Sequence, residues 1–261
     1  MTDAHCHVSG GDPSVRELLI GRDFVGVHPW SILSGARSAS FACRAIDDLR
    51  AQLAANPRLG VGEIGLDRLK EKTISPEMRE LFAAQLALAF EFHRPVVLHG
   101  AKCWGEVVKE VARGESESLR FRRGEAESLR FRTKVRTTTF LFHGFSRSDG
   151  LIPDIVRLNG YISVGPAVLN DHAVNYRALV KKIPLDRLLV ETDRDCSPEE
   201  MLNPLTKQPL MIRDVLEKTA ELRGLSPTEL EAATDANAAR FIGEDAEYGI
   251  IRDLTKDGSQ L

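Results

Sequence analysis

The chain has 261 residues, of which 43% are hydrophobic and 28% charged; this is the composition of a soluble globular protein, and the length suits one (β/α) barrel or two smaller domains. No apolar run approaches the roughly 20 residues of a membrane helix, and the N-terminus has no basic-then-apolar signal pattern, so we expect a cytoplasmic or nuclear location. The four cysteines lack CxxC spacing, so we expect reduced thiols. The formal net charge of −3 argues against a broad basic face for nucleic acid, but it leaves open a nuclease whose positive charge comes from bound metal ions.

Short β-rich runs alternate with longer helical patterns, which predicts βα units around a parallel sheet. Ser75-Pro76 places a cap and a proline at the start of a predicted helix over residues 76–92. The capping box at residues 226–229 predicts another helix that runs toward Arg240. The predicted strands are an N-terminal run that ends near His7 and residues 24–27, 59–64, 95–98, 137–142, 160–164 and 187–190.

These elements predict an α/β fold of the TIM barrel type. Seven strands are predicted, whereas a closed barrel has eight, and the stretch between His7 and Phe24 is too short for a strand and a helix together. Either residues 15–20 are more structured than they look, or one βα unit is shortened or missing near the N-terminus. We expect a single barrel over residues 1–243 and a polar tail over residues 244–261.

A tandem duplication interrupts the barrel pattern. Residues 113–122 and 123–132 are identical except that Ala126 replaces Ser116, and two copies are too few for a solenoid. Residues 113–136 contain eight Arg or Lys and four Glu, so the segment is positively charged. Because it follows a helix and precedes a strand, we expect a flexible, solvated insertion at the N-terminal face of the barrel, opposite the face that holds barrel active sites. The open alternatives are a nucleic-acid arm and a contact for a protein partner.

His5 and His7 stand two residues apart in a predicted strand. Side chains of a strand alternate between its two faces, so both imidazoles point the same way and Cys6 points the opposite way, toward the core. Two imidazoles on one face are half of a divalent-metal site. The alternative is two ordinary histidines in a polar N-terminal tail.

Further ionisable residues stand at or just beyond the ends of predicted strands. The C-terminal strand ends of a parallel barrel converge on one mouth. Each of these residues alone has a structural explanation, such as a buried histidine with satisfied hydrogen bonds or an aspartate that caps a helix, but together with the N-terminal pair they predict a metal centre. They are His28, Glu63, His99, His143 and Asp193.

The stretches around these residues are TDAHCH at 2–7, GVHPW at 26–30, GEIGLD at 62–67, PVVLH at 95–99, HGFS at 143–146, PLDRLLVETD at 184–193 and, more weakly, NAARF at 237–241. In content and order they resemble the TatD-type deoxyribonucleases, metal-dependent hydrolases of the amidohydrolase superfamily that fold as TIM barrels. Any one stretch is unspecific, whereas the set spans nearly the whole chain.

The resemblance implies two divalent metal ions, of Mg²⁺, Zn²⁺ or Mn²⁺, with Glu63 as the catalytic bridge between them. One ion would be held by His5, His7 and Asp193, and the other by His99 and His143. The implied activity is cleavage of DNA phosphodiester bonds by metal-activated water, with Asp193 as the general base.

The expected substrate contacts lie around these ligands. His28 stands beside the metals and is expected to contact the phosphate, while Trp30 either stacks on a base or packs as a rim aromatic. The chain departs from the family at Ala101, where an Arg or Lys is usual. It departs again after Asp193, where the family usually has a small residue and a proline and this chain has Arg194. Lys102 and Arg194 are the remaining candidates for positive charge near the substrate. These departures leave open a hydrolase of another small amide, ester or phosphoester, and a barrel that acts mainly as a scaffold for protein–protein interaction.

Overall fold

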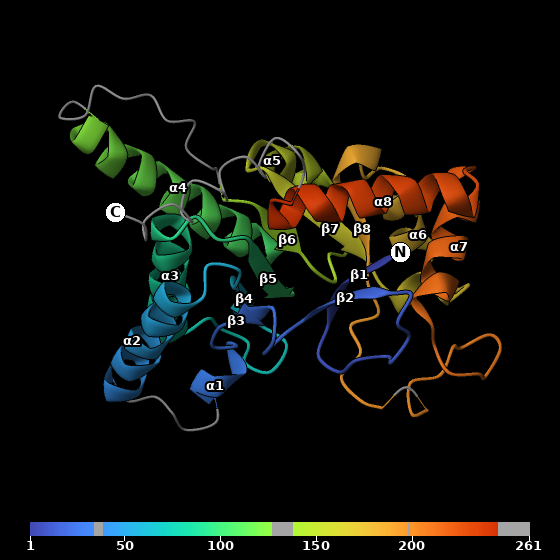
Figure 1. Ribbon diagram of the computed structural model, residues 1–261, viewed down its shortest axis with the longest axis horizontal. Coiled ribbons are helices and arrows are strands. Elements are labelled where there is room, and N and C mark those ends of the chain that lie inside the picture. Colours follow the sequence, from blue (N-terminus) through green and yellow to red (C-terminus); the bar gives the residue numbers. More distant parts are fainter. Residues whose placement is uncertain (34–38, 127–137, 198, 245–261) are drawn as a thin grey trace, which may run out of the picture.

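In the part of the chain that the structure describes, eight parallel strands and the helices between them build the fold (Figure 1). The computed structural model describes residues 1–33, 39–126, 138–197 and 199–244. The strands are β1 (Thr2–Cys6), β2 (Arg16–Leu19), β3 (Phe24–Val25), β4 (Gly60–Asp67), β5 (Val96–Ala101), β6 (Phe140–Phe142), β7 (Gly160–Val164) and β8 (Leu188–Val190).

The strands follow one another in chain order. Strands β3 to β8 form one six-stranded parallel sheet, and β1 pairs with β2 in a second parallel sheet. A bridge between Ile20 and Phe24 links the two sheets on one side. On the other side the Asp193 N–H donates to the His5 carbonyl (3.0 Å) and the His7 N–H donates to the Arg194 carbonyl (2.8 Å). These links place the strands around a barrel of the TIM type, as predicted, although single bonds replace a full ladder at the two junctions.

Of the two alternatives that the sequence left open for the N-terminal part, the structure confirms the first, that residues 15–20 are more structured than they look. Residues 16–19 form the strand β2, so the eighth strand is present, and what the short path from His7 to Phe24 lacks is a helix. Parallel neighbours usually need a crossover of about a dozen or more residues. Here residues 7–15 connect β1 to β2 as a loop, and Gly21 (φ 88°) turns the chain directly from β2 into β3.

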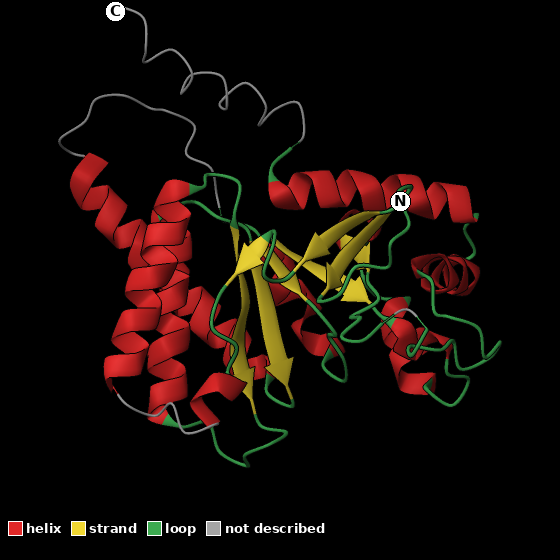
Figure 2. Cartoon of the chain, turned by 60° about the horizontal axis from the view of Figure 1, so that its bottom comes forward, coloured by secondary structure: helices red, strands yellow, loops and turns green. Residues whose placement is uncertain are grey.

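The helices lie outside the strands (Figure 2). Helices α2, α3 and α4 are grouped beside β4 and β5, and α8 lies across β8 (Figure 1). The capping signals are confirmed: Ser75 Oγ accepts from Met78 N–H at the start of α3, and Ser226 and Glu229 form the capping box of α8. The helices are α1 (Trp30–Leu33), α2 (Ala39–Ala55), α3 (Pro76–Glu91), α4 (Trp104–Ala126), α5 (Ile152–Arg157), α6 (Val174–Val180), α7 (Ile212–Arg223) and α8 (Pro227–Ile242), with 3-10 turns η1 (Asp149–Leu151), η2 (Pro166–Leu169) and η3 (Leu185–Arg187).

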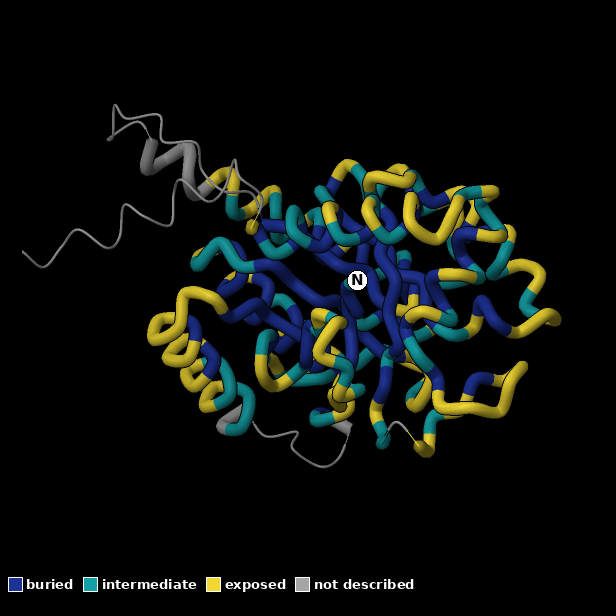
Figure 3. The backbone as a smooth tube through the Cα atoms, turned by 45° about the vertical axis from the view of Figure 1, so that its right-hand side comes forward, coloured by how far each residue is buried: buried dark blue, intermediate teal, exposed yellow. Residues whose placement is uncertain are grey.

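The strands form the buried centre of the molecule (Figure 3). Phe241 of α8 stacks on Phe24 with ring centroids 5.8 Å apart, and its carbonyl accepts from Thr139 Oγ1 just before β6. Burying such a side chain contributes about 1.5–3 kcal/mol. Phe241 thus closes the N-terminal end of the barrel and leaves the C-terminal end for a site. The apolar cluster around it comprises Ala4, Leu18, Phe24, Val97, Leu141, Tyr161, Leu189, Ala238 and Phe241.

The duplicated segment is partly described. Helix α4 continues through the first copy as far as Ala126, so this part of the duplicated segment is helical. Residues 127–137, which include most of the second copy, and the predicted tail beyond Glu244 lie outside the described residues. None of the described helices is long and apolar enough to cross a membrane.

Candidate metal centre

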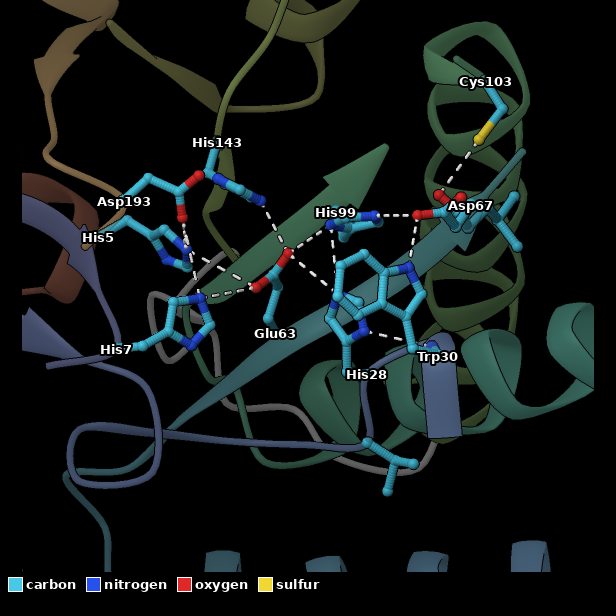
Figure 4. A network of polar contacts seen from close by, with 12 residues as sticks. His5, His7, His28, Trp30, Glu63, Asp67, His99, Cys103, His143 and Asp193 are labelled. Carbon is cyan, nitrogen blue, oxygen red and sulfur yellow. Dashed lines mark hydrogen bonds and ion pairs between the residues drawn. The ribbon is translucent and has the colours of Figure 1, made fainter. Parts of the chain in front are cut away.

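The six predicted metal ligands meet at the C-terminal end of the barrel (Figure 4). They come from widely separated parts of the chain, and each is brought there by its own strand. His5 lies in β1 and His7 just after it, Glu63 lies in β4, His99 in β5, His143 directly after β6, and Asp193 three residues after β8.

The carboxylate of Glu63, only 4% exposed, is the centre of the cluster. Its two oxygens face different histidines, which is the arrangement expected of a bridging carboxylate. Oε1 lies 2.5 Å from His99 Nδ1, 2.7 Å from His143 Nε2 and 3.5 Å from His28 Nε2, and Oε2 lies 3.4 Å from His7 Nε2 and 3.6 Å from His5 Nε2.

Asp193 completes the group around the N-terminal histidines. Its Oδ1 lies 3.3 Å from His5 Nε2 and 3.8 Å from His7 Nε2, and its side chain is 46% exposed. One ligand atom from each of these three residues fits within 4.8 Å of the others. Asp193 has a left-handed backbone (φ 51°), which is uncommon for a residue other than glycine and is found disproportionately at functional sites.

The buried nitrogens of His5 indicate that the cluster is built for a cation. Nδ1 makes no hydrogen bond within the described part of the chain, nor does His143 Nδ1, and Nε2 makes none of good geometry although it lies 3.3 Å from Asp193 Oδ1. Burial, together with the nearby His143 ring, lowers the pKa of His5 to about 4, so its imidazole is neutral at pH 7 and has a lone pair to offer. Leaving such groups unpaired costs about 1–3 kcal/mol each. Mixed imidazole and carboxylate donors fit a divalent metal but do not choose among Mg²⁺, Mn²⁺ and Zn²⁺.

The charge on Glu63 is fixed by its neighbours. Burial alone would raise its pKa, but His143, His28 and His7 outweigh burial and lower the pKa well below its usual range. Glu63 is therefore ionised throughout the neutral range. The contact also affects His143. Burial opposes its charged form, but the carboxylate of Glu63 outweighs burial and raises the pKa of His143 to about 10.

His28 stands beside the ligands with its proton in a defined place. The backbone N–H of Trp30 points at His28 Nδ1 (3.2 Å), so Nδ1 accepts and the proton of the neutral ring lies on Nε2. Nε2 lies 3.3 Å from His99 Nδ1 and 3.5 Å from Glu63. This tautomer suits a hydrogen-bond donor toward an anion. One ring nitrogen of His28 also lies within 4.8 Å of ligand atoms of Glu63 and His99, so His28 belongs to one of the groups that could hold a metal ion.

Asp67 is a residue of the candidate site that the sequence analysis did not single out. Its Oδ2 accepts from His99 Nε2 (2.9 Å) and from Trp30 Nε1 (2.7 Å), and its Oδ1 accepts from the backbone of Leu69 and Lys70. Burial opposes ionisation, but the hydrogen bonds from His99 and Trp30 outweigh it and lower the pKa of Asp67. A carboxylate on the far nitrogen of a histidine fixes its tautomer and orientation for metal binding. The available signal was strand alternation, because Glu63 and Asp67 share one face of β4.

A second missed carboxylate supports His143. Glu191 is buried, accepts from Ser163 Oγ (2.5 Å) and the Gly144 N–H (2.8 Å), and lies 3.9 Å from His143 Nδ1. Burial raises the pKa of Glu191 to about 7. Glu191 thereby anchors the turn that begins at His143.

The structure places Trp30 and Lys102 at the same end of the barrel as the histidines, whereas Arg194 lies elsewhere. Trp30, 40% exposed, packs edge-on against His28 (4.8 Å between centroids), and Lys70 Nζ lies 3.4 Å from its ring centroid. Lys102 is exposed directly after β5, at the same end of the barrel.

Arg194 does not face the histidines. It is 2% exposed, its Nη2 donates to the Leu210 carbonyl (3.1 Å), and its Nη1 lies 3.5 Å from Glu17 Oε1. The predicted substrate contact of Arg194 is therefore replaced by a contact inside the fold.

Known structures share this fold. The TatD homologue YJJV from Escherichia coli K12 superposes with a TM-score of 0.63 at 24% identity, covering 88% of this chain and 78% of that chain. A TatD family hydrolase from Entamoeba histolytica gives a TM-score of 0.62 at 15% identity, covering 88% of this chain and 76% of that chain.

Curated relatives extend the likeness to the sequence. The uncharacterized metal-dependent hydrolase YcfH of E. coli K12 is 28% identical over 94% of this chain and 97% of its own length. The 3'-5' ssDNA/RNA exonuclease TatD of Cronobacter sakazakii is 29% identical over 85% of this chain and 76% of its own length.

The family model described as TatD related DNase matches residues 22–243. His5 and His7 precede the matched residues, so their assignment depends on the geometry around Glu63 and Asp193. The match includes the other four predicted ligands and extends through α8 to residue 243. The chain therefore belongs to the TatD-related DNase family of metal-dependent hydrolases.

Proposed function

We propose that this protein hydrolyses phosphodiester bonds of nucleic acid, with DNA as the substrate and water as the nucleophile. The observation that carries the proposal is the Glu63 carboxylate, with imidazole nitrogens around both of its oxygens and Asp193 beside it. The relatives named as ssDNA/RNA exonucleases support the same class of bond and suggest attack from a 3' end.

Two divalent ions fit the donor set. His5, His7 and Asp193 would hold one ion, and the resemblance assigns the other to His99 and His143, with Glu63 between the two. Ligand atoms of His143 and His99 each lie in a group with the Glu63 carboxylate, His143 together with His5 and His99 together with His28. When bound, such ions lower the pKa of water toward neutrality and offset the charge of the phosphate.

The protein side chains have separate tasks in this reaction. Asp193, ionised and half-exposed, accepts the proton of the attacking water. The Nε2–H of His28 donates to a phosphate oxygen, because its Nδ1 is already engaged by the Trp30 backbone. Asp67 keeps His99 in the tautomer that turns Nδ1 toward Glu63.

The test is nucleotide release from end-labelled single-stranded DNA in Mg²⁺, Mn²⁺ or Zn²⁺. We expect hydrolysis with at least one of these ions and a loss of 10²-fold or more in Asp193→Asn, since general bases typically contribute about 10²–10⁴-fold. Asp186→Asn, at an exposed carboxylate before β8, is the matched control. No release with any ion, beside an active reference nuclease, would refute the proposal.

One observation keeps a second activity in view. Ala101 stands where the resembling family usually has a cationic residue, so a small phosphoester, amide or lactone is the alternative substrate. A panel in which such a compound is turned over faster than DNA would favour it.

The setting of the protein is also a proposal. All four cysteines are free, which fits a reducing compartment such as the cytoplasm or nucleus. Residues 113–136 are a candidate contact for a protein partner. Deleting the second copy, residues 123–132, tests whether a cellular role depends on this segment rather than on Asp193.

A further inference from the structure

A cavity of about 990 Å³ opens beside the candidate metal centre, where β6, β7 and β8 end. Asp193 and Gly144 are among the residues that line it, so the cavity reaches the candidate metal ligands. Trp30 lies on the opposite side of Glu63 from Asp193 (Figure 4). A ligand that lies across the metal centre would therefore extend into this cavity on one side and toward Trp30 on the other.

One wall of the cavity is apolar. Pro166 and Ala167 of η2 line it together with Val174 at the start of α6. Val174 is 68% exposed, a large apolar surface for a valine at a cavity wall. Ligand sites commonly combine such apolar walls with a few placed polar groups. This wall suits a flat, weakly polar group such as a nucleobase.

The charged lining has one uncommitted arginine. Arg147 is exposed, stands four residues after His143, and makes no hydrogen bond or ion pair from its guanidinium to the described residues. The other charged side chains of the lining have partners: Lys182 pairs with Asp149, Glu191 is buried and bonded to Ser163 and Gly144, and Asp193 lies 3.3 Å from His5 Nε2. The sparsely populated backbone of Arg147 (φ 61°) is a conformation that proteins retain mostly where surrounding structure or function requires it.

We propose that this cavity binds the nucleotide next to the scissile phosphate, with its base against Val174 and its phosphate at Arg147. The proposal rests on the proposed function and specifies the subsite that favours strands over small phosphodiesters. Cavities of about 300–1,000 Å³ hold drug-sized ligands. A cavity of this size can hold a ligand as large as a nucleotide.

The experiment compares two substrates at the same metal concentration: a single-stranded oligonucleotide, and bis(4-nitrophenyl) phosphate, a phosphodiester with no neighbouring nucleotide. We expect Arg147→Ala to lower the ratio of kcat/KM for the oligonucleotide over the small diester by about tenfold or more. The slope of log kcat/KM for the oligonucleotide against log salt concentration should become shallower by about 0.7, as expected for the loss of one phosphate contact with a single strand. Arg147→Lys keeps the charge and should keep the slope.

Val174→Asp should also lower the ratio, because it places a carboxylate on the wall that receives the base. Arg58→Ala removes an exposed arginine at the opposite end of the barrel, just before β4, and should leave both ratio and slope at the wild-type values. All these side chains are exposed, and thermal unfolding verifies that each variant folds.

The outcomes separate the two proposals. If the wild-type protein hydrolyses neither substrate, the proposed function fails and the subsite with it. If the wild type hydrolyses both, but Arg147→Ala and Val174→Asp leave ratio and slope unchanged, the subsite is wrong and the hydrolase stands.

Discussion

His99 lies between Glu63 and Asp67, with Nδ1 2.5 Å from the first carboxylate and Nε2 2.9 Å from the second. The Asp67 oxygen that bonds His99 also accepts from Trp30 Nε1. Asp67→Asn places an amide there, which either presents an N–H toward two donors or rotates to present its oxygen without charge. We expect metal affinity to fall about 10–100-fold, the usual cost of losing such a partner. Calorimetric titration with Mn²⁺ measures it.

Asp186→Asn is again the matched control for that experiment, since this carboxylate is exposed before β8. Trp30→Phe removes only the second donor to Asp67 and should weaken metal binding less than Asp67→Asn. Wild-type affinity in Asp67→Asn would mean that packing alone orients His99.

The residues at strand ends were predictable because parallel strands deliver their C-terminal ends to one mouth. This rule brought His99 and His143 to Glu63 without knowledge of any contact. Trp30 stands at the start of α1 and Asp67 at the end of β4, 37 positions apart. No short sequence pattern spans both residues, so their hydrogen bond could not be predicted. Only the shared face of Glu63 and Asp67 hinted at the second carboxylate.

Arg194 was misplaced because its partner lies in β2, which the sequence left only as one of two alternatives for residues 15–20. Without β2, nothing in the sequence indicated that Glu17 would lie beside the segment after β8. Both departures from the expected pattern take part in the contact between Glu17 and Arg194, since Glu17 lies in the short N-terminal path and Arg194 follows Asp193. A Cβ on Gly10 would lie 2.3 Å from Arg194 Nη1, so the loop after β1 fits closely over the guanidinium.

We therefore expect Arg194→Met to destabilise the fold. Its side chain is 3% exposed and that of Glu17 is 9% exposed, and removing one partner of a buried pair typically costs about 3–5 kcal/mol. Urea unfolding measures the loss, and a double-mutant cycle with Glu17→Gln isolates the pairwise part, expected at about 0.5–3 kcal/mol. Arg58→Met, at an exposed position, should change stability by no more than about 0.5 kcal/mol. Additive single-variant effects would show that the two side chains act independently.

The cysteines should react in an order set by burial. Burial raises the pKa of the Cys103 thiol to about 12, and Cys103 Sγ donates to the Leu66 carbonyl (3.2 Å). At pH 8 only about one in ten thousand such thiols is ionised, and the thiolate is the reactive form. Cys6 is likewise buried, whereas Cys43 is exposed on α2. We expect Ellman's reagent to modify Cys43 rapidly and to modify Cys6 and Cys103 only after urea unfolds the protein. Rapid modification of Cys103 in the native protein would contradict the buried placement.

Metal binding should raise the unfolding temperature, because the ligands of the centre come from six separate chain positions and assemble only in the folded state. A ligand that binds only the native state stabilises it by about 2.7 kcal/mol at a hundred times its Kd. For a chain of this size that corresponds to a rise of roughly 5–10 °C. Thermal unfolding after chelation, and again after Mn²⁺ is restored, measures the shift. His5→Ala removes a fully buried ligand and should lose most of it, whereas His172→Ala, an exposed imidazole on none of the ligand-bearing strands, should keep it. An equal shift in both variants would place the stabilising ion elsewhere than between His5, His7 and Asp193.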